Sequence, residues 1–257
     1  MTPKVAMEDP SPLLTVMPYA PNRAAALVLA DCDSRIVFLH DQQSPSAEEY
    51  RRIVSRLGSQ HPVGGTLMVT SPTPGDGKTL TSINLALCLA ERAPTLLIDL
   101  DTRHSTVRRR LNIPLIGPGI EDALLELAPP EACLLSIPGT RLCTCTNRGD
   151  GHAIIDLMAL GRPKRFLDWA LHRFMWVVID TPPAFPIADT LEIANHAPIG
   201  MMIVRARKTP ARLVKQAMDA LKGHINYVVL NDGEAPSYSI YNHHYYFGLE
   251  SDNRRRK

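Results

Sequence analysis

The chain has 257 residues, of which 45% are apolar, and this is enough to bury a single substantial core. Its 28 basic and 26 acidic residues leave a net charge of +2, which gives no reason to expect a nucleic-acid partner. No stretch approaches the ~20 apolar residues of a membrane-spanning helix and no secretory leader is evident, so we expect a cytoplasmic protein without direct membrane insertion. The five cysteines lack CxxC spacing, which favours reduced thiols, with Cys143 and Cys145 packed in a core.

The N-terminal part of the chain is predicted to become ordered only gradually. Residues 1–32 contain many prolines and no sustained hydrophobic period, so we expect a disordered lead-in. A short strand is predicted over residues 36–39. A helix should follow it, because Ser46 and Glu49 have the spacing of a capping box and apolar residues then recur at helical intervals.

From residue 66 onward, apolar runs alternate with amphipathic periods. The runs are predicted to be strands buried on both faces, at residues 66–70, 95–100, 176–179, 201–204 and 226–230. Helical periods lie between them, and one is expected to begin at Pro210 behind a Thr209 cap. The alternation predicts an α/β fold with a doubly wound, mostly parallel sheet flanked by helices, in a single domain over residues 33–232. Residues 233–257 are expected to form a flexible, tyrosine-rich tail.

The strongest chemical signal is a phosphate-binding loop between the strand at 66–70 and the helix after it. Gly75 and Gly77 allow the backbone to turn its N–H groups toward phosphate oxygens at the start of a helix. Lys78 is expected to bridge the β and γ phosphates of ATP, and the Thr79 hydroxyl to ligate Mg²⁺. The strict pattern has glycine six residues before the lysine, where this chain has Pro72. The residues predicted to contact the nucleotide here are Pro74, Gly75, Asp76, Gly77, Lys78, Thr79 and Leu80.

Carboxylates follow two later strands, at the edge where open α/β sheets place their ligands. Alternation puts Asp99 and Asp101 on the same side of one strand end, and Asp180 closes another apolar strand in the manner of a Walker B acid. A single acid in such a place is often only a turn residue, but three acids after a phosphate loop predict a site. The predicted metal ligands are Thr79, Asp99, Asp101 and Asp180, and the predicted catalytic residues are Lys78 and the same three acids.

These motifs, in this order, resemble those of the bacterial tyrosine kinases of capsule and exopolysaccharide synthesis, the CpsD/CapB type. The resemblance runs from about Ser46 to the C-terminus and includes Asp-Thr-Pro-Pro after the second acidic strand. It implies that Arg205 contributes to the nucleotide site and that Asn231 lies near the adenine. It also includes the C-terminal tyrosine cluster that is the family's autophosphorylation target, here Tyr238, Tyr241, Tyr245 and Tyr246.

The resemblance further implies an ATP- and magnesium-dependent protein tyrosine kinase. Lys78, Thr79 and Asp180 would hold Mg·ATP. Asp99 or Asp101 would complete the metal site, and one of the two would orient or deprotonate the incoming tyrosine hydroxyl. Subunits of a homo-oligomer would exchange tails, and a separate membrane-bound activator of the polysaccharide co-polymerase type would recruit the chain to the inner face of the plasma membrane.

Several positions depart from the family pattern. The ring-forming Glu-x-x-Arg-x-x-Arg motif ends at Val54, so no oligomer size is predicted. His104 and Ser105 stand where the family often has a basic residue and proline, and residues 147–152 replace a Pro-rich turn.

Two other hypotheses stay open. A ParA/MinD-like ATPase switch shares the core motifs, but such proteins usually carry a second lysine near the start of the loop, where this chain has Thr73, and they lack a tyrosine-rich tail. A degenerate kinase retained as a binding subunit is a further possibility, against which the intact loop and acids argue. A Rossmann dehydrogenase is dismissed, because no GxGxxG follows the relevant strand.

Overall fold

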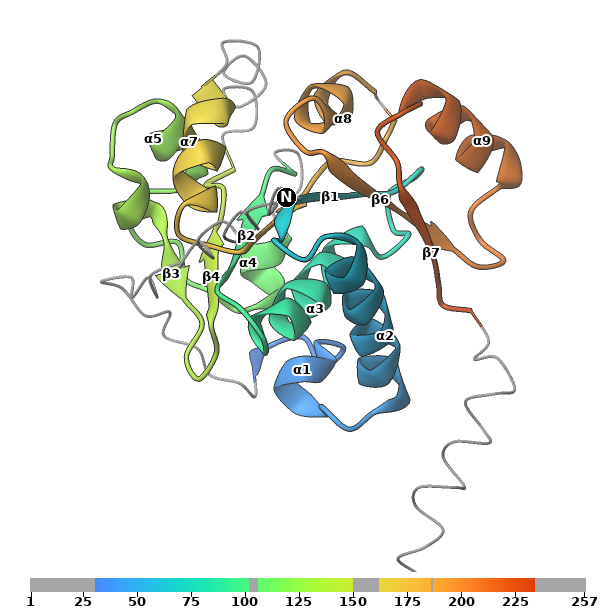
Figure 1. Cartoon of the computed structure of the whole chain (residues 1–257), viewed down its shortest axis with the longest axis horizontal. Coiled ribbons are helices and arrows are strands. Elements are labelled where there is room, and N and C mark those ends of the chain that lie inside the picture. The colour runs from blue at the N-terminus through green and yellow to red at the C-terminus, as the bar shows by residue number, and fades with distance from the viewer. Residues whose placement is uncertain (1–30, 102–105, 150–161, 186, 234–257) are drawn as a thin grey trace, which may run out of the picture.

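A single sheet of seven strands runs through the middle of the molecule in the computed structural model, which describes residues 31–101, 106–149, 162–185 and 187–233 (Figure 1). The strand order is β3-β4-β2-β5-β1-β6-β7, and all neighbours are parallel except β3 and β4. The strands are β1 (Gly65–Thr70), β2 (Thr95–Asp99), β3 (Leu135–Ser136), β4 (Leu142–Cys145), β5 (Trp176–Asp180), β6 (Ile199–Arg205) and β7 (Tyr227–Asn231). The predicted α/β fold with a mostly parallel sheet is confirmed.

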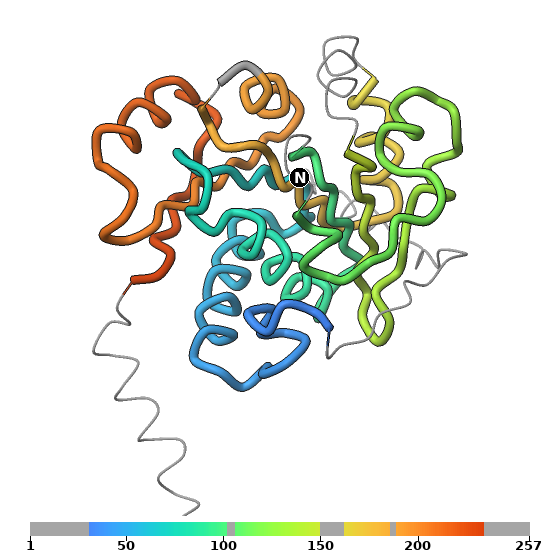
Figure 2. Tube along the Cα trace, turned by 180° about the vertical axis from the view of Figure 1, so that it is seen from behind, coloured from blue at the N-terminus to red at the C-terminus, as the bar shows by residue number. Residues whose placement is uncertain are grey.

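Helices cover both faces of this sheet (Figures 1 and 2). One face carries α1 (Val37–His40), α2 (Pro45–Gln60), α3 (Lys78–Ala90) and α4 (Val107–Arg110). The other face carries α5 (Ile120–Leu124), the 3-10 helix η2 (Pro130–Cys133), α7 (Arg162–Leu171), α8 (Ile187–Ala194) and α9 (Ala211–Ala220). Within the described ranges, no helix is both long and apolar enough to cross a bilayer.

The strands pack by alternation, as their period of two requires. In β1, Leu67 and Val69 join the apolar cluster beneath α2 and α3, whereas Met68 joins the cluster beneath α7. Because both faces are covered, β2 and β5 are buried along their whole length, which explains their continuous apolar runs. Since β1, β5 and β2 are adjacent and parallel, the segments that follow them meet at one edge of the sheet.

Two predictions near the start of the described chain are wrong. Residues 37–40 form the short helix α1 instead of a strand, closed by the Asp41 N–H donating to the Val37 carbonyl (2.8 Å). Helix α2 begins at Pro45, and its N-cap is Ser44, whose hydroxyl accepts from the Ala47 N–H (3.2 Å). Proline is well suited to the first helical position, so the helix starts there and the capping box predicted at residue 46 does not form.

Three further predictions concern the cysteines of β4, the start of α9 and the two ends of the chain. Cys143 and Cys145 lie buried in β4 as free thiols, as predicted. Helix α9 begins at Ala211 with Pro210 as its N-cap, because the Thr209 hydroxyl is bonded elsewhere. Residues 1–30 of the lead-in expected at 1–32, the segment 150–161 and residues 234–257 of the tail expected at 233–257 lie outside the described residues, whereas Cys32 is described and buried.

Candidate active site

The loop between β1 and α3 has the backbone conformation that its glycines were expected to permit. Gly75 and Gly77 have φ of 86° and 100°, in the left-handed region that favours glycine. Gly77 is also the N-cap of α3, and a Cβ placed on it would lie 2.2 Å from Nδ2 of Asn231. Glycine is therefore favoured at position 77 by the positive φ and by the close approach of the Asn231 side chain.

Asp76 stabilises this loop from within. Its buried carboxylate accepts hydrogen bonds from the N–H and the hydroxyl of Thr73 (both 2.9 Å) and from the hydroxyl of Thr209 (2.7 Å). Asn231 Nδ2 donates to the Asp76 carbonyl (2.8 Å). The loop is thus connected to the segment before α9 and to the end of β7.

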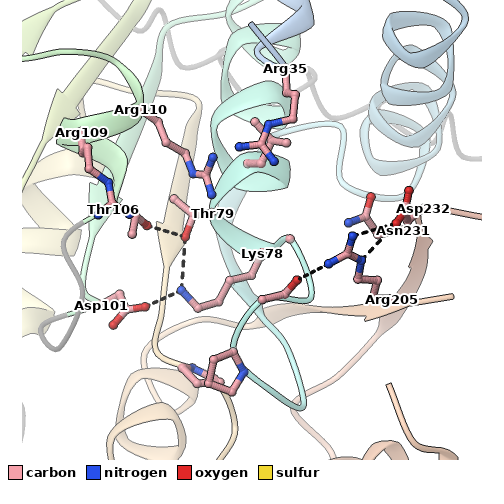
Figure 3. Close-up of a pocket in the computed structure, with 15 residues that line it drawn as sticks. Arg35, Lys78, Thr79, Asp101, Thr106, Arg109, Arg110, Arg205, Asn231 and Asp232 are labelled. Carbon is pink, nitrogen blue, oxygen red and sulfur yellow. Dashed lines mark hydrogen bonds and ion pairs between the residues drawn. The ribbon is translucent and has the colours of Figure 1, made fainter. Parts of the chain in front are cut away.

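A pocket of about 430 Å³ lies over the loop, a volume suited to a small-molecule ligand (Figure 3). Its wall contains nine of the residues predicted for the site: Pro74, Gly75, Gly77, Lys78, Thr79, Leu80, Asp101, Arg205 and Asn231. Asp76, Asp99 and Asp180 are not in that wall. They lie directly behind it, as buried side chains.

The three acids converge on Lys78. Asp99 and Asp180 lie opposite each other in the β2–β5 register, and both are fully buried. Lys78 Nζ lies 2.5 Å from Asp101 Oδ2 and 3.9 Å from Asp180 Oδ2. Asp99 accepts instead from the backbone N–H groups of Asp101 (3.1 Å) and Val107 (3.3 Å), so it shapes the turn that presents Asp101.

The electrostatics of this group favour an added cation. Burial and the neighbouring Asp180 charge raise the pKa of Asp99 well above its usual range, and burial likewise raises the pKa of Asp180. Burial alone would lower the pKa of Lys78, but Asp180 and Asp101 outweigh it, so the pKa lies above the ordinary lysine value. One ammonium among three carboxylates leaves an excess of negative potential that a divalent cation would neutralise.

The residues around Thr79 fit a magnesium ion. The Thr79 hydroxyl accepts from Thr106 Oγ1 (2.9 Å) and lies 3.3 Å from Lys78 Nζ. Ser82 Oγ donates to Asp180 Oδ1 (3.1 Å), whereas the buried Asp180 Oδ2 has no hydrogen-bond partner among the described residues. Such an oxygen is suited to a cation or its water. No group of three or more His, Cys, Asp or Glu in the described ranges is arranged to hold a metal by itself. Mg²⁺ is usually bound by one or two protein ligands together with phosphate oxygens and water.

Sequence reasoning missed several residues of the pocket wall, namely Arg35, Thr106, Arg109, Arg110, Pro183 and Asp232. The run of arginines at 108–110, shortly after Asp101, was a signal that could have been used. Arg35 gave none, because it precedes α1 and reaches the pocket only through tertiary contacts. One of these is the Asn84 Nδ2 donating to the Arg35 carbonyl (3.1 Å).

No family model matches the chain, but curated relatives do. It is 25% identical over 223 residues to tyrosine-protein kinase YwqD of Bacillus subtilis, covering 84% of this chain and 92% of the relative. It is 26% identical over 196 residues to tyrosine-protein kinase CpsD of Streptococcus agalactiae, covering 70% and 79%. Some relatives are much longer: the match to tyrosine-protein kinase ptk of Acinetobacter johnsonii spans 65% of this chain but only 23% of that protein, at 26% identity.

Solved structures of kinase domains also resemble this chain. The VpsO kinase domain has 27% identity and a TM-score of 0.67, covering 74% of this chain and 95% of that one. The chimerical protein CapA2B2 has 21% identity and a TM-score of 0.70, covering 79% and 93%. McdA of Cyanothece, solved as an ATP complex, shares the fold more distantly, with 17% identity, a TM-score of 0.54 and coverage of 71% and 79%. In sequence and in fold, the chain is similar to bacterial protein-tyrosine kinases of the CpsD/CapB type, which have the P-loop fold related to ParA and MinD.

Proposed function

We propose that this chain is an ATP-dependent tyrosine kinase that phosphorylates its own C-terminal tyrosines and thereby regulates capsule or exopolysaccharide synthesis and export. The observation that carries the proposal is Lys78, held at the pocket between Asp101 (2.5 Å) and Asp180 (3.9 Å). The similarity to named tyrosine kinases supports the choice of acceptor. The proposed acceptors are Tyr238, Tyr241, Tyr245 and Tyr246, in a tail of residues 233–257 that follows a kinase domain of residues 33–232 and a lead-in of 1–32.

The geometry of the site supports a role for each residue in the proposed reaction. Lys78 would neutralise charge on the transferred phosphoryl group, and the loop N–H groups would orient the phosphates. Thr79 and Asp180 would hold the magnesium ion, which supplies further charge neutralisation when bound. Asp101 lines the pocket and Asp99 does not, so we assign to Asp101 the orientation of the tyrosine hydroxyl and the acceptance of its proton.

Arg205 and Asn231 occupy the far end of the same pocket, beside the loop (Figure 3). Arg205 is held by Asp232, with Nε and Nη2 each 3.0 Å from Oδ2, and its Nη1 donates to the Gly75 carbonyl (3.4 Å). This end is the proposed site of the ribose and adenine, where the Asn231 side chain would lie next to the base.

The proposed partners are a second copy of the chain and a membrane protein. Tails exchanged between copies would present the tyrosines, and a membrane-bound activator of the co-polymerase type would bring the chain to the inner face of the plasma membrane. The longer relatives support a partner. The chain matches only 23–24% of proteins such as ptk and the putative tyrosine-protein kinase EpsB of Ralstonia solanacearum, so most of each of these proteins has no counterpart in this chain, and a separate partner would supply it.

The test is incubation of the full chain with Mg·ATP, with and without a candidate activator segment, followed by a phosphotyrosine blot. Lys78→Ala is expected to abolish the signal, and phenylalanine at all four tail tyrosines to remove most of it. A signal that survives Lys78→Ala, or no signal under any activating condition, would refute the kinase.

A ParA/MinD-like switch is the second candidate, because McdA shares the fold at a TM-score of 0.54. The kinase is favoured by the higher TM-scores of 0.67 and 0.70 for kinase structures. The absence of a lysine at Thr73 also favours it. A switch would show ATP-dependent dimerisation and slow hydrolysis without phosphotyrosine.

A further inference from the structure

Three arginines line the pocket on the side of α4. Figure 3 shows Arg35, Arg109 and Arg110 on one side of Lys78 and Thr79, with the proposed base-binding end on the other. They come from two segments distant in sequence, since Arg35 precedes α1 and the other two belong to α4. The proposed kinase mechanism gives them no role.

This side of the pocket carries unbalanced positive charge. Arg35 and Arg110 share a single carboxylate, that of Asp33, and Arg109 forms no ion pair with any described residue. Elsewhere in the pocket wall each cation has its own carboxylate, since Lys78 pairs with Asp101 (2.5 Å) and Arg205 with Asp232 (3.0 Å). Three guanidinium groups with one carboxylate leave two positive charges facing the pocket.

Two of these arginines, Arg35 and Arg110, are also held in place before any ligand arrives. Arg35 donates to the Asp33 carboxylate through Nε (2.9 Å) and Nη2 (2.8 Å), and Arg110 Nη1 donates to the same carboxylate. Hydrogen bonding to Arg35 holds the pKa of Asp33 well below its usual range, so the shared carboxylate stays ionised. Groups fixed in this way lose little side-chain entropy when an anion binds.

Arg110 retains a donor without an acceptor. Its Nε is buried, and no described residue accepts from it. A buried guanidinium N–H without an acceptor is unfavourable, and a ligand oxygen would relieve the cost. This donor and the excess charge together indicate an anion with several oxygens.

We propose that Arg35, Arg109 and Arg110 form a second anion subsite, which binds a phosphoryl group beside the one held by the glycine loop. Planar guanidinium groups match the geometry of phosphate oxygens. The proposed function supplies two sources of such a group, the nucleotide's own phosphate chain and a tail tyrosine that is already phosphorylated. The identity of these sources, though not the anion subsite itself, rests on that proposed function.

The test uses the full-length chain and two probes in binding calorimetry. One probe is Mg·ADP. The other is a peptide of residues 238–246 phosphorylated on Tyr245, added to protein saturated with Mg·ADP, with the unphosphorylated peptide as its reference. The variant is Arg35→Gln with Arg109→Gln, since both side chains are exposed and replacement should leave folding intact, which a thermal melt would check. Arg212→Gln, an exposed arginine on α9 away from this pocket, is the control.

We expect the double variant to bind one probe about 10-fold more weakly than wild type, a loss typical of removed charge-assisted phosphate contacts. Weaker Mg·ADP binding identifies the nucleotide as the source, and weaker binding of the phosphopeptide alone identifies phosphotyrosine. Affinities within twofold of wild type for both probes, or a wild type that binds neither, would overturn the subsite. These binding measurements need no catalysis. A chain that makes no phosphotyrosine would therefore refute the proposed kinase activity, but the binding data would still show whether the anion subsite exists.

Discussion

The buried oxygen of Asp180 is a feature that the folded chain alone does not explain. Asp180 Oδ1 accepts from Ser82, but Oδ2 has no donor among the described residues and lies 3.9 Å from Lys78 Nζ. Lys78 compensates this charge only in part, because its ammonium is bonded to Asp101 (2.5 Å), and a buried carboxylate that is only partly compensated destabilises the fold. The arrangement therefore sacrifices stability in the empty site for ligand binding, which is typical of functional residues.

We predict that Asp180→Asn separates the two effects. The amide keeps the shape of the side chain and removes its charge. Magnesium should therefore no longer strengthen ATP binding, a loss of about 10-fold or more, while the nucleotide-free chain should melt at the same temperature or higher. ATP titrations with magnesium and with a chelator, beside thermal melts, measure both effects. Asp168→Asn, an exposed change on α7, is the control, and an undiminished magnesium effect in Asp180→Asn would contradict the assignment.

Asp76 leads to a second prediction at this scale. Replacing it by alanine leaves the Thr73 N–H and two hydroxyls without their acceptor. Because Thr73 and Thr209 are half-buried, each lost bond should cost less than the roughly 1–3 kcal/mol of a fully buried group left unpaired. We expect Asp76→Ala to lower both the melting temperature and the ADP affinity, the latter by about 10-fold.

Thr209 provides the matched pair for this experiment. Thr209→Val removes one of the three bonds to Asp76, together with the bond that the hydroxyl accepts from the Arg205 N–H (2.9 Å), and should cause a smaller loss than Asp76→Ala. Thr209→Ser keeps the hydroxyl and both bonds and should behave as wild type. If Thr209→Val binds ADP as tightly as Thr209→Ser, the link between the loop and the segment before α9 does not support the site.

Among single residues, the sequence predicted well the site residues that belong to a contiguous motif. Lys78 and Thr79 are recognisable from their neighbours, and Asp180 from the strand that it ends. Arg35 is different, because its place in the pocket depends on the contact of Asn84 with its carbonyl and on the ion pair between Arg110 and its neighbour Asp33, which only the tertiary structure forms. Local patterns cannot encode such contacts.

At the scale of elements, the buried strands were easier to predict than the short helices. Strands β1, β2 and β5 were predicted nearly to the residue, because burial on both faces produces continuous apolar runs. Helix α1 is a four-residue turn, too short to show a period. The start of α2 was misplaced because serines at 44 and 46 flank Pro45 and both are good caps, so the difference between them is small.

The contact between the glycine loop and β7 yields a prediction about packing. Gly75→Ala and Gly77→Ala both force a non-glycine residue into the left-handed region, at a cost of about 1–2 kcal/mol. A Cβ at position 75 meets nothing within 4 Å, whereas at position 77 it lies 2.2 Å from Asn231 Nδ2. Gly77→Ala should therefore lower the unfolding free energy of the nucleotide-free chain more than Gly75→Ala does.

A double-mutant cycle isolates the steric part of this effect. Asn231→Ala removes the atom that the new Cβ would meet, so Gly77→Ala should cost less in that background than in wild type. Denaturant unfolding of the four proteins measures the coupling. Strict additivity would show that the loop and β7 do not press on each other at this point.

At the scale of the whole molecule, the five thiols are distributed through both layers that cover the sheet. Cys32 and Cys88 belong to the apolar cluster of α1–α3, and the remaining three, Cys133, Cys143 and Cys145, to the cluster of α5 and α7. Burial raises the pKa of Cys88 and of Cys143 to about 12. All five are buried and none forms a disulfide, so thiol exposure reports on the opening of the whole core.

We predict that a thiol reagent at pH 8 labels the native chain only slowly and all five cysteines at once in denaturant. The reacting species is the thiolate, which raised pKa values make scarce, and burial blocks the reagent. Mg·ATP at 100 times its Kd should slow native labelling by about 100-fold, because binding to the folded chain adds about 2.7 kcal/mol to the cost of opening. Lys78→Ala should lose this protection while it keeps the slow labelling without nucleotide. One cysteine that reacts rapidly in the native chain, at a rate insensitive to Mg·ATP, would show that its part of the core opens independently of the nucleotide site.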